Sequence, residues 1–300
     1  MSAAGLWWRG ARPRTLVAGL TPVVVGAAAS AGSLWQWRFA AALVVALGLQ
    51  VGVNLANDAL DGMRGVDTAE RLGPPRLVAS GAASPRAVLV AAFVGLGVAA
   101  AAGLALAIAT SPVPILAIGA LALLAALLYS GGPRPYAGLG LGELMVFLFF
   151  GLMATCGTSF VVGGTVTAAA WWSGAALGLL AVAILVANNL RDIETDAGAG
   201  KRTLAVRLGG RRTRLLYRAC VVGGFLVIVA GVGAFLADES VGITRWALVA
   251  LVAWPLAIKP MDVVGTASGR DLIPVLVGTA ALEAGFGAAL ALGLLLERTT

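Results

Sequence analysis

Apolar residues form long stretches along most of this 300-residue chain, and short polar segments separate them. A bilayer core needs about 20 mostly apolar residues per helix. Turn-forming residues such as Ser111-Pro112 interrupt the apolar stretches. The pattern predicts an all-α polytopic membrane protein with about nine transmembrane helices, over residues 15–31, 39–57, 87–110, 113–130, 141–158, 169–190, 214–237, 243–259 and 272–296.

Composition agrees with this interpretation and narrows the chemistry. Hydrophobic residues make up 60% of the chain and charged residues only 12%, whereas a soluble domain carries about 25% charged residues. The 41 glycines suit close approach of membrane helices. The chain has no histidine, which removes histidine catalysis and the commonest transition-metal ligand. Carboxylate and amide oxygens remain, and these are the ligands that Mg²⁺ prefers.

Basic residues are distributed unequally between the two sides of the predicted membrane protein. The net charge of +7 could suggest nucleic acid, but loop arginines beside apolar spans are better explained by membrane orientation. Eighteen of the 21 Lys and Arg lie on the side of the amino terminus, and the exceptions are Arg38, Arg245 and Arg298. The positive-inside rule therefore predicts a multi-pass protein of the cell membrane with a cytoplasmic amino terminus.

Acidic residues gather at the cytoplasmic ends of two predicted helices. At the first of these ends, Asn54, Asp58 and Asp61 follow one another at i, i+4 and i+7. Asn57 and Asp61 are also four residues apart, so all four side chains share about one helical face. Asp67 follows in the adjoining loop.

The second cluster repeats the Asn-x-x-x-Asp spacing four helices later. Asn188, Asp192 and Asp196 stand at i, i+4 and i+8, which predicts a common face if the helix continues through them. The similarity of the two clusters suggests an internal repeat. We therefore expect one transmembrane domain over residues 1–300, with pseudo-repeats over about 15–130 and 141–259 and a final helix over 272–296.

Charged carboxylates close to hydrocarbon are costly, at about 2.5–3.5 kcal/mol each by the lower insertion estimates at mid-bilayer. A bound Mg²⁺ would offset that cost and would also bridge carboxylates to a substrate phosphate. Two facing clusters would then hold one diphosphate. The alternative is that both are ordinary polar helix ends in contact with water, although their shared spacing and shared side argue against it. Nearby basic residues suit phosphate oxygens, in particular Arg12, Lys201 and Arg202.

An ordered set of motifs resembles the UbiA superfamily of intramembrane prenyltransferases over essentially the whole chain. The motifs are Arg12-Pro-Arg-Thr15, Asn57-Asp58-x-x-Asp61, Tyr129-Ser-Gly-Gly-Pro-Arg134-Pro-Tyr136, Gly142-Glu143, Asn188-Asn189-Leu-Arg-Asp192 with Asp196, and Gly200-Lys201-Arg202-Thr203. The first cluster continues through Gly65 to Asp67, where other branches more often have Asp in place of Gly65. In having Gly65 at this position, the chain resembles the branch of the superfamily that uses 1,4-dihydroxy-2-naphthoate.

The resemblance implies Mg²⁺-dependent transfer of a polyprenyl group from polyprenyl diphosphate to 1,4-dihydroxy-2-naphthoate, with loss of CO₂ and diphosphate, giving demethylmenaquinone. The implied metal ligands are Asn57, Asp58, Asp61, Asp67, Asp192 and Asp196, and the implied catalytic residues are Asp58, Asp61, Asp192 and Asp196. The implied substrate-binding residues are Arg12, Asn54, Tyr129, Arg134, Tyr136, Asn188, Lys201 and Arg202.

Two alternatives remain open at this point. The acceptor could be another UbiA-type substrate, such as 4-hydroxybenzoate, haem, chlorophyllide or a phosphoribose. A secondary transporter is the alternative from a different class, but its polar groups would be expected near the midplane of the membrane. Glu143, Lys259 and Glu283 lie at or within predicted spans, where a charge is by default a sign of function. Glu283 has no role that the sequence suggests.

Overall fold

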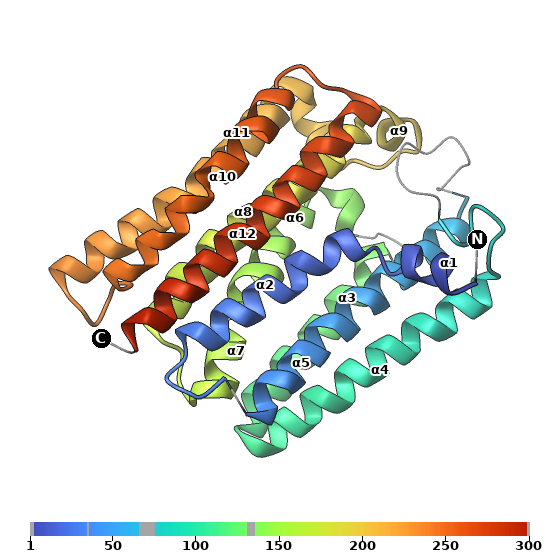
Figure 1. Cartoon of the computed structure of the whole chain (residues 1–300). Coiled ribbons are helices and arrows are strands. Elements are labelled where there is room, and N and C mark those ends of the chain that lie inside the picture. Colours follow the sequence, from blue (N-terminus) through green and yellow to red (C-terminus); the bar gives the residue numbers. More distant parts are fainter. Residues whose placement is uncertain (1–2, 35, 66–75, 131–135, 299–300) are drawn as a thin grey trace.

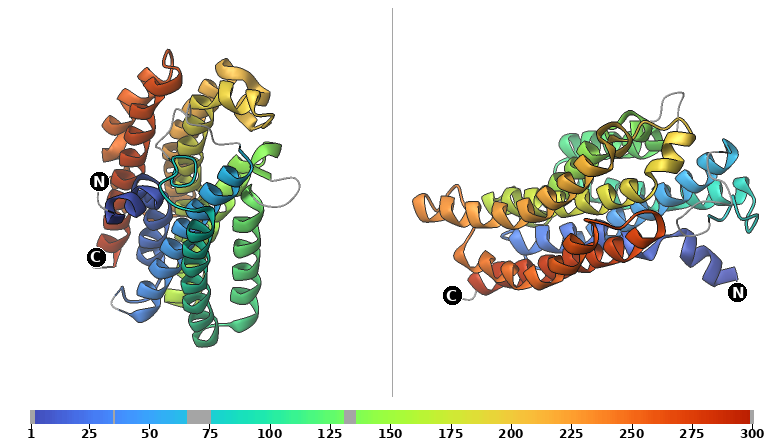
Figure 2. Two further views of the ribbon diagram at one scale, coloured as in Figure 1. Left: turned by 90° about the vertical axis from the view of Figure 1, so that its right-hand side faces the viewer. Right: turned by 90° about the horizontal axis from the view of Figure 1, so that it is seen from above.

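A computed structural model describes residues 3–34, 36–65, 76–130 and 136–298. The described parts of the chain contain helices and no strand. The long helices run side by side in one bundle, and the two termini lie at opposite ends of it (Figures 1 and 2). Opposite termini are what an odd number of membrane passes requires.

Eight described segments are long and apolar enough to cross a membrane, and the shorter apolar helix Thr15–Ala29 adds a ninth. The all-α membrane fold expected from the sequence is therefore confirmed. The elements are α1 (Ala3–Gly10), α2 (Pro13–Ala29), α3 (Trp37–Met63), α4 (Pro85–Ala109), α5 (Pro112–Ser130), η1 (Tyr136–Leu139), α6 (Gly142–Val146), η2 (Phe147–Met153), α7 (Ala154–Gly163), α8 (Ala168–Arg191), α9 (Ile193–Gly198), α10 (Leu204–Ala237), η3 (Arg245–Ala253), α11 (Trp254–Val263), η4 (Gly269–Leu272) and α12 (Ile273–Glu297).

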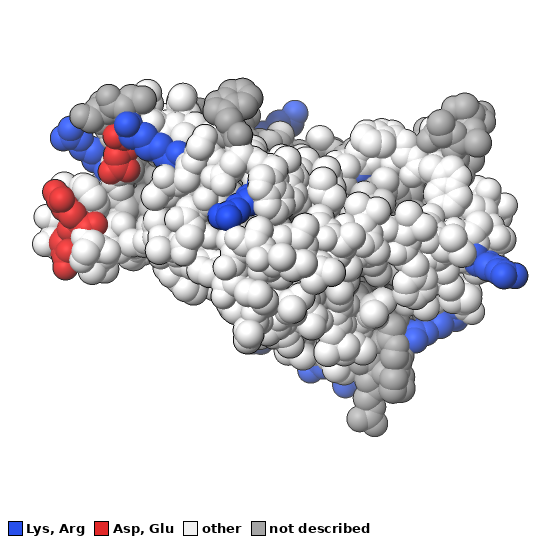
Figure 3. Space-filling model, turned by 90° about the horizontal axis from the view of Figure 1, so that it is seen from below, with Lys and Arg blue, Asp and Glu red and all other residues white. Residues whose placement is uncertain are grey.

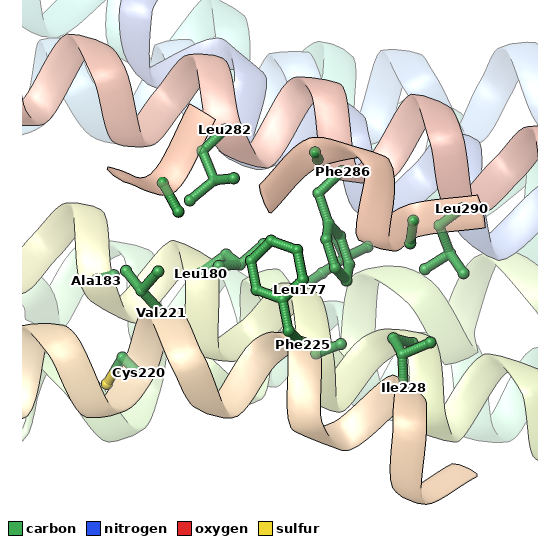
Figure 4. Close-up of a cluster of buried hydrophobic side chains, with 14 of the residues drawn as sticks. Leu177, Leu180, Ala183, Cys220, Val221, Phe225, Ile228, Leu282, Phe286 and Leu290 are labelled. Atoms are coloured by element: carbon green, nitrogen blue, oxygen red, sulfur yellow. The ribbon is translucent and has the colours of Figure 1, made fainter. Parts of the chain in front are cut away.

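The largest apolar core lies where α8, α10 and α12 meet. Side chains from these three helices point toward one another in Figure 4, among them Leu177, Phe225 and Phe286. The rings of Phe225 and Phe286 stand edge to face with centroids 5.1 Å apart. Small residues allow close packing elsewhere, because a Cβ on Gly151 would lie only 2.5 Å from the Cα atom of Gly178.

Helices α8 and α5 show how differently two equally apolar helices can be placed. In the apolar part of α8, 61% of the residues are buried inside the protein, against 6% in α5. One face of the molecule carries few charged side chains, and most of these lie toward its edges (Figure 3). Side chains such as Val113, which is 80% exposed, would face lipid.

The observed elements differ from the predicted spans at several ends. Helix α3 continues to Met63 and so includes the whole first cluster. Helix α10 begins at Leu204, ten residues earlier than expected, and it is interrupted at Gly209, whose φ is 75°. An apolarity criterion cannot find this first part, because arginines fill a helix that extends beyond the apolar stretch.

Glu283 is fully buried in α12, and neither of its carboxylate oxygens has a hydrogen-bond partner. The described residues therefore provide no ion pair that would explain this carboxyl group, and its role stays open.

Candidate functional site

The first cluster occupies the last turns of α3, as its spacing predicted. Asn54, Asn57, Asp58 and Asp61 are all buried there. Several buried polar side chains at one helix end need partners, because an unpaired buried polar group is costly. The partners of Asn54, Asp58 and Asp61 come from three other segments of the chain.

Asp61 joins the first cluster to the second half of the molecule. Its Oδ2 atom lies 3.4 Å from the Nη2 atom of Arg76 and 3.6 Å from the Nζ atom of Lys201. Asp61 and Arg76 are both buried, whereas 30% of the Lys201 side chain is exposed. The Lys201 contact brings the segment after α9 to the end of α3, across 140 residues of sequence.

Asp58 is occupied by the backbone of the loop that precedes α4. Its two carboxylate oxygens accept hydrogen bonds from the backbone N–H groups of Leu77, at 2.8 Å, and Val78, at 3.0 Å. Asn54 holds the opposite side, since its amide donates to the carbonyl of Ala11 and the hydroxyl of Thr15. Asp58 therefore holds the loop before α4 in place, and Asn54 holds the turn before α2.

Asn57 differs from its neighbours because its side-chain oxygen has no partner in the parts of the chain that the structure describes. The residue is 6% exposed, and its Oδ1 atom makes no hydrogen bond. An orphaned amide oxygen beside the Asp61 carboxylate fits the donor set that a hard divalent cation takes. The described residues contain no group of three or more acidic or cysteine side chains placed to hold a metal ion. Any ion here would need amide oxygens, substrate oxygens or water in addition to the carboxylates.

The second cluster does not lie on one continuous helix, and that prediction is wrong. Helix α8 ends at Arg191, Asp192 has the non-helical angles φ −97° and ψ 11°, and α9 begins at Ile193. At this break Arg191 donates two hydrogen bonds to the Asp192 carboxylate, at 2.7 and 2.5 Å. Asn188 stays near the end of α8, and Asp196 lies on α9, both half-buried.

The loop after α9 connects the second cluster to η1. The backbone N–H of Lys201 donates to the carbonyl of Asp196 at 2.8 Å. The N–H of the exposed Arg202 donates to the carbonyl of Gly138 at 3.2 Å, and the Arg202 carbonyl accepts from Arg207. Both predicted phosphate-binding residues of this loop thus lie between the second cluster and η1.

Arg12 stands at the turn between α1 and α2 in a strained conformation. Its φ of 54° is the one positive φ of a non-glycine residue in the described parts of the chain. Such a conformation costs on the order of 1–3 kcal/mol and often marks a functional position. The turn is held by Thr15, whose N–H and hydroxyl both donate to the Arg12 carbonyl.

Two tyrosines complete the site. The rings of Tyr129 and Tyr136 meet edge to face, with centroids 5.4 Å apart. Tyr129 is half-buried and lies within electrostatic reach of Arg12, Glu143 and Asp61. Burial raises the pKa of the Tyr136 hydroxyl, and the neighbouring Tyr129 raises it further, so the group remains a neutral hydrogen-bond donor.

Two predicted site residues, Asp67 and Arg134, lie outside the described residues, so their roles stay predictions. The structure adds groups that the sequence did not single out as site residues. Arg76 pairs with Asp61, Arg191 pairs with Asp192, and the Asn189 amide donates to Glu143 at 2.9 Å. The sequence offered one signal for the two arginines, since each stands close to one of the acidic clusters. Nothing in the spacing connects Glu143 with Asn189.

Together these contacts assemble one polar site from the turn before α2, the ends of α3 and α8, the region around η1, and the loop after α9. Arginine and lysine side chains lie among the carboxylates within it. Such a mixture can hold a polyanion and a divalent cation together, because each compensates charge that the protein alone leaves unbalanced.

Known proteins share both sequence and fold with the chain. Residues 19–270 match the UbiA prenyltransferase family. The chain is 46% identical over 283 residues to a 1,4-dihydroxy-2-naphthoate octaprenyltransferase of Mycobacterium tuberculosis, covering 93% of both chains. It is 35% identical over 269 residues to the Escherichia coli protein of the same name, covering 86% of this chain and 84% of that one.

Solved structures agree on the fold. An apo UbiA homologue from Aeropyrum pernix K1 superposes with a TM-score of 0.71 at 18% identity, over 96% of this chain and 99% of that one. A homologue from Archaeoglobus fulgidus, solved with DMAPP and Mg²⁺, gives a TM-score of 0.59 at 17% identity, over 95% and 99%. The family match over most of the chain, the identity to these relatives and the shared helical bundle show that the chain belongs to the UbiA prenyltransferase family of membrane enzymes.

Proposed function

We propose that this prenyltransferase moves a polyprenyl group from polyprenyl diphosphate to 1,4-dihydroxy-2-naphthoate, releasing diphosphate and CO₂ and giving the quinol form of demethylmenaquinone. The choice of acceptor is supported by two relatives named for it, at 46% and 35% identity over most of the chain. The observation that carries the diphosphate part is the Lys201–Asp61 contact, because it puts both polar clusters beside one another at one end of the bundle.

Asn57, Asp61, Asp192 and Asp196 are the residues that would hold Mg²⁺, with Asp67 as a further candidate. The free Oδ1 atom of Asn57 and the adjoining Asp61 carboxylate support this assignment. When bound, Mg²⁺ would neutralise the leaving diphosphate and so lower the barrier to breaking the allylic C–O bond. Asp58 would support the site indirectly, because both of its oxygens already accept backbone hydrogen bonds.

Arg12, Lys201 and Arg202 are our candidates for direct contacts to the diphosphate, and Asn54 and Asn188 for supporting polar contacts. As the C–O bond breaks, its electron pair stays on the diphosphate oxygen, and fixed cations there stabilise the transition state. The prenyl tail would extend along the apolar helices toward lipid. The strain at Arg12 supports a functional position for this guanidinium group.

Tyr129, Tyr136 and Arg134 are our candidates for the acceptor pocket. Arg134 would pair with the naphthoate carboxylate, and the tyrosines would cover the ring. The ring carbon that carries the carboxylate attacks the allylic carbon and forms the new C–C bond. The carboxylate then leaves as CO₂, and its bond pair returns to the ring as the prenylated naphthoquinol, the reduced form of demethylmenaquinone. Burial of this region would keep water away from the reactive allylic centre.

We further propose that the protein lies in the plasma membrane with its amino terminus and its site toward the cytoplasm. The support is the excess of Lys and Arg on that side of the spans. A cysteine introduced at the exposed Ala82 should react with a membrane-impermeant maleimide only in inside-out vesicles. Labelling in intact cells would reverse this orientation.

The activity can be tested with membranes that contain the protein, Mg²⁺, a polyprenyl diphosphate and carboxyl-labelled 1,4-dihydroxy-2-naphthoate. The expected result is labelled CO₂ together with an equal amount of prenylated naphthoquinol, both abolished by a chelator and restored by Mg²⁺. Turnover with 4-hydroxybenzoate and none with the naphthoate would contradict the acceptor. Running several prenyl chain lengths in parallel would define the donor.

A further inference from the structure

A second basic region lies on α10, just beyond the break at Gly209. Arg211, Arg212, Arg214 and Arg218 follow one another there within about two helical turns. Together with Leu215 and Gly265 they line a hollow of about 450 Å³ between α10 and the segment that follows α11. We propose that this hollow is a binding site for the phosphate headgroup of an anionic phospholipid.

Two of the four arginines are held in place by backbone carbonyls. Arg214 donates from Nε to Val264 at 2.9 Å and from Nη2 to Ala267 at 2.7 Å. Arg218 donates from Nε to Met261 at 3.2 Å. These bonds use only part of each guanidinium group, which has five N–H donors in all. The remaining donors are therefore pre-positioned at the wall of the hollow.

Arg211 and Arg212 supply the other two positive charges, and both side chains are exposed to solvent. The ion pairs among the described residues include none of the four arginines. The nearest acidic side chain on the facing segment is Asp262, which is exposed, and its backbone carbonyl lies beside Gly265. Four concentrated positive charges without a carboxylate partner favour an anion, and planar guanidinium groups match phosphate oxygens especially well.

The hollow is distinct from the candidate active site. None of its lining residues takes part in the hydrogen bonds or ion pairs that connect the two polar clusters, as far as the described residues show. It belongs to the same end of the bundle: Arg214 contacts the turn after α11, and Arg218 contacts the last turn of α11.

The surroundings favour a lipid over a soluble anion. Leu215, in the wall of the hollow, is 68% exposed, and Leu226, three helical turns further along the same face, is 59% exposed. On the facing helix, Ile258 is 56% exposed. A phospholipid fits both features, because its phosphate would contact the arginines and its acyl chains would lie along these apolar side chains. Basic pockets between membrane helices at the cytoplasmic side bind anionic headgroups in this way.

The test is a titration of the whole detergent-purified protein with phosphatidylglycerol or phosphatidylcholine, followed by native mass spectrometry. We expect saturable binding of one phosphatidylglycerol and at least about fivefold weaker binding of phosphatidylcholine. Arg211→Gln and Arg212→Gln should each weaken phosphatidylglycerol binding about fivefold, because each removes one cation near the headgroup. Both side chains are exposed, so the melting temperature should not change.

Arg86→Gln is the matched control, since it removes one exposed arginine at the start of α4, outside the hollow. Its phosphatidylglycerol affinity should stay within about twofold of the parent. Three results would overturn the proposal: equal affinity for the two lipids, an equal loss in the Arg86 variant, or displacement of phosphatidylglycerol by low concentrations of inorganic phosphate. The last result would identify a site for a soluble anion instead.

Discussion

The two Asn/Asp clusters have nearly the same spacing in the sequence, yet the structure uses them differently. In the first, Asn57, Asp58 and Asp61 lie on one unbroken, buried helix end. In the second, α8 ends before Asp192, and the neighbouring Arg191 pairs with that carboxylate. The first cluster therefore lies on a single helix, and the second is divided between the end of α8 and the short helix α9. Similar motifs can thus play unequal parts in one site.

The comparison also separates residues within the first cluster. Asp58 accepts hydrogen bonds from the loop before α4, Asp61 pairs with Arg76 and Lys201, and the Asn57 oxygen has no partner among the described residues. These differences predict unequal consequences for substitution. The four substitutions below are ordered from the largest expected effect to the smallest.

Asp61→Asn should lower kcat for prenyl transfer on the order of 10³-fold. The substitution removes a carboxylate charge from the proposed metal site and leaves Lys201 without its ion-pair partner. The rate should be measured with purified protein at saturating Mg²⁺. Asp238→Asn, at an exposed loop position, is the matched control and should keep the parental rate. A fully active Asp61 variant would remove this carboxylate from the site.

Asn57→Ala should raise the Mg²⁺ concentration needed for half-maximal activity about 10- to 100-fold, as the loss of a metal-supporting group does. Its melting temperature should fall less than that of Asn54→Ala, because the Asn57 Oδ1 atom makes no hydrogen bond among the described residues. Asn54→Ala provides the contrast. It loses two hydrogen bonds to the α1–α2 turn, so it should melt earlier at an unchanged Mg²⁺ requirement. The reverse pattern would exchange the roles of the two asparagines.

Lys201→Met should raise the KM for polyprenyl diphosphate about tenfold, because it removes a cation that lies between the two clusters. Methionine is also unbranched and nearly as long as lysine, which limits the effect on packing. Lys259→Met, at an exposed position on α11, serves as the control. A KM within about twofold of the parent would exclude Lys201 from donor binding.

Asp58→Asn should act mainly on stability, with a loss of about 1–3 kcal/mol, because an amide cannot accept both loop N–H groups. We expect the rate per folded molecule to remain within about threefold of the parent. Thermal unfolding followed by tryptophan fluorescence, with activity normalised to folded protein, measures both. A variant with the parental melting temperature and a large loss of rate would instead make Asp58 a metal ligand.

Much of this protein is predictable from local pattern alone. The apolar stretches predicted the membrane helices, because lipid requires each span to be long, apolar and helical. The spacing of Asn54, Asp58 and Asp61 predicted their common helix face, since helical geometry depends only on sequence separation. The ordered motifs also predicted the family, which the match over residues 19–270 confirms.

The prediction was less successful where partners lie far apart in the chain. The pairing of Asp61 with Lys201, and of Glu143 with Asn189, joins segments that no local period connects. The end of α8 before Asp192 was not predicted either, because the Asn-x-x-x-Asp spacing is compatible with a continuous helix. The internal repeat stays a prediction, as do the metal ligands and the orientation in the membrane.

By itself, therefore, the sequence determined that the chain is a helical membrane protein with two acidic helix ends, because lipid and helix geometry act on neighbouring residues. Only the tertiary structure decided which carboxylate fixes a loop, which one faces cations, and which amide oxygen is left free. The physical reason is that a buried polar group must find its partners among whatever the fold brings near it. At the end of α3 those partners come from distant parts of the chain, and at the end of α8 from the adjacent residue.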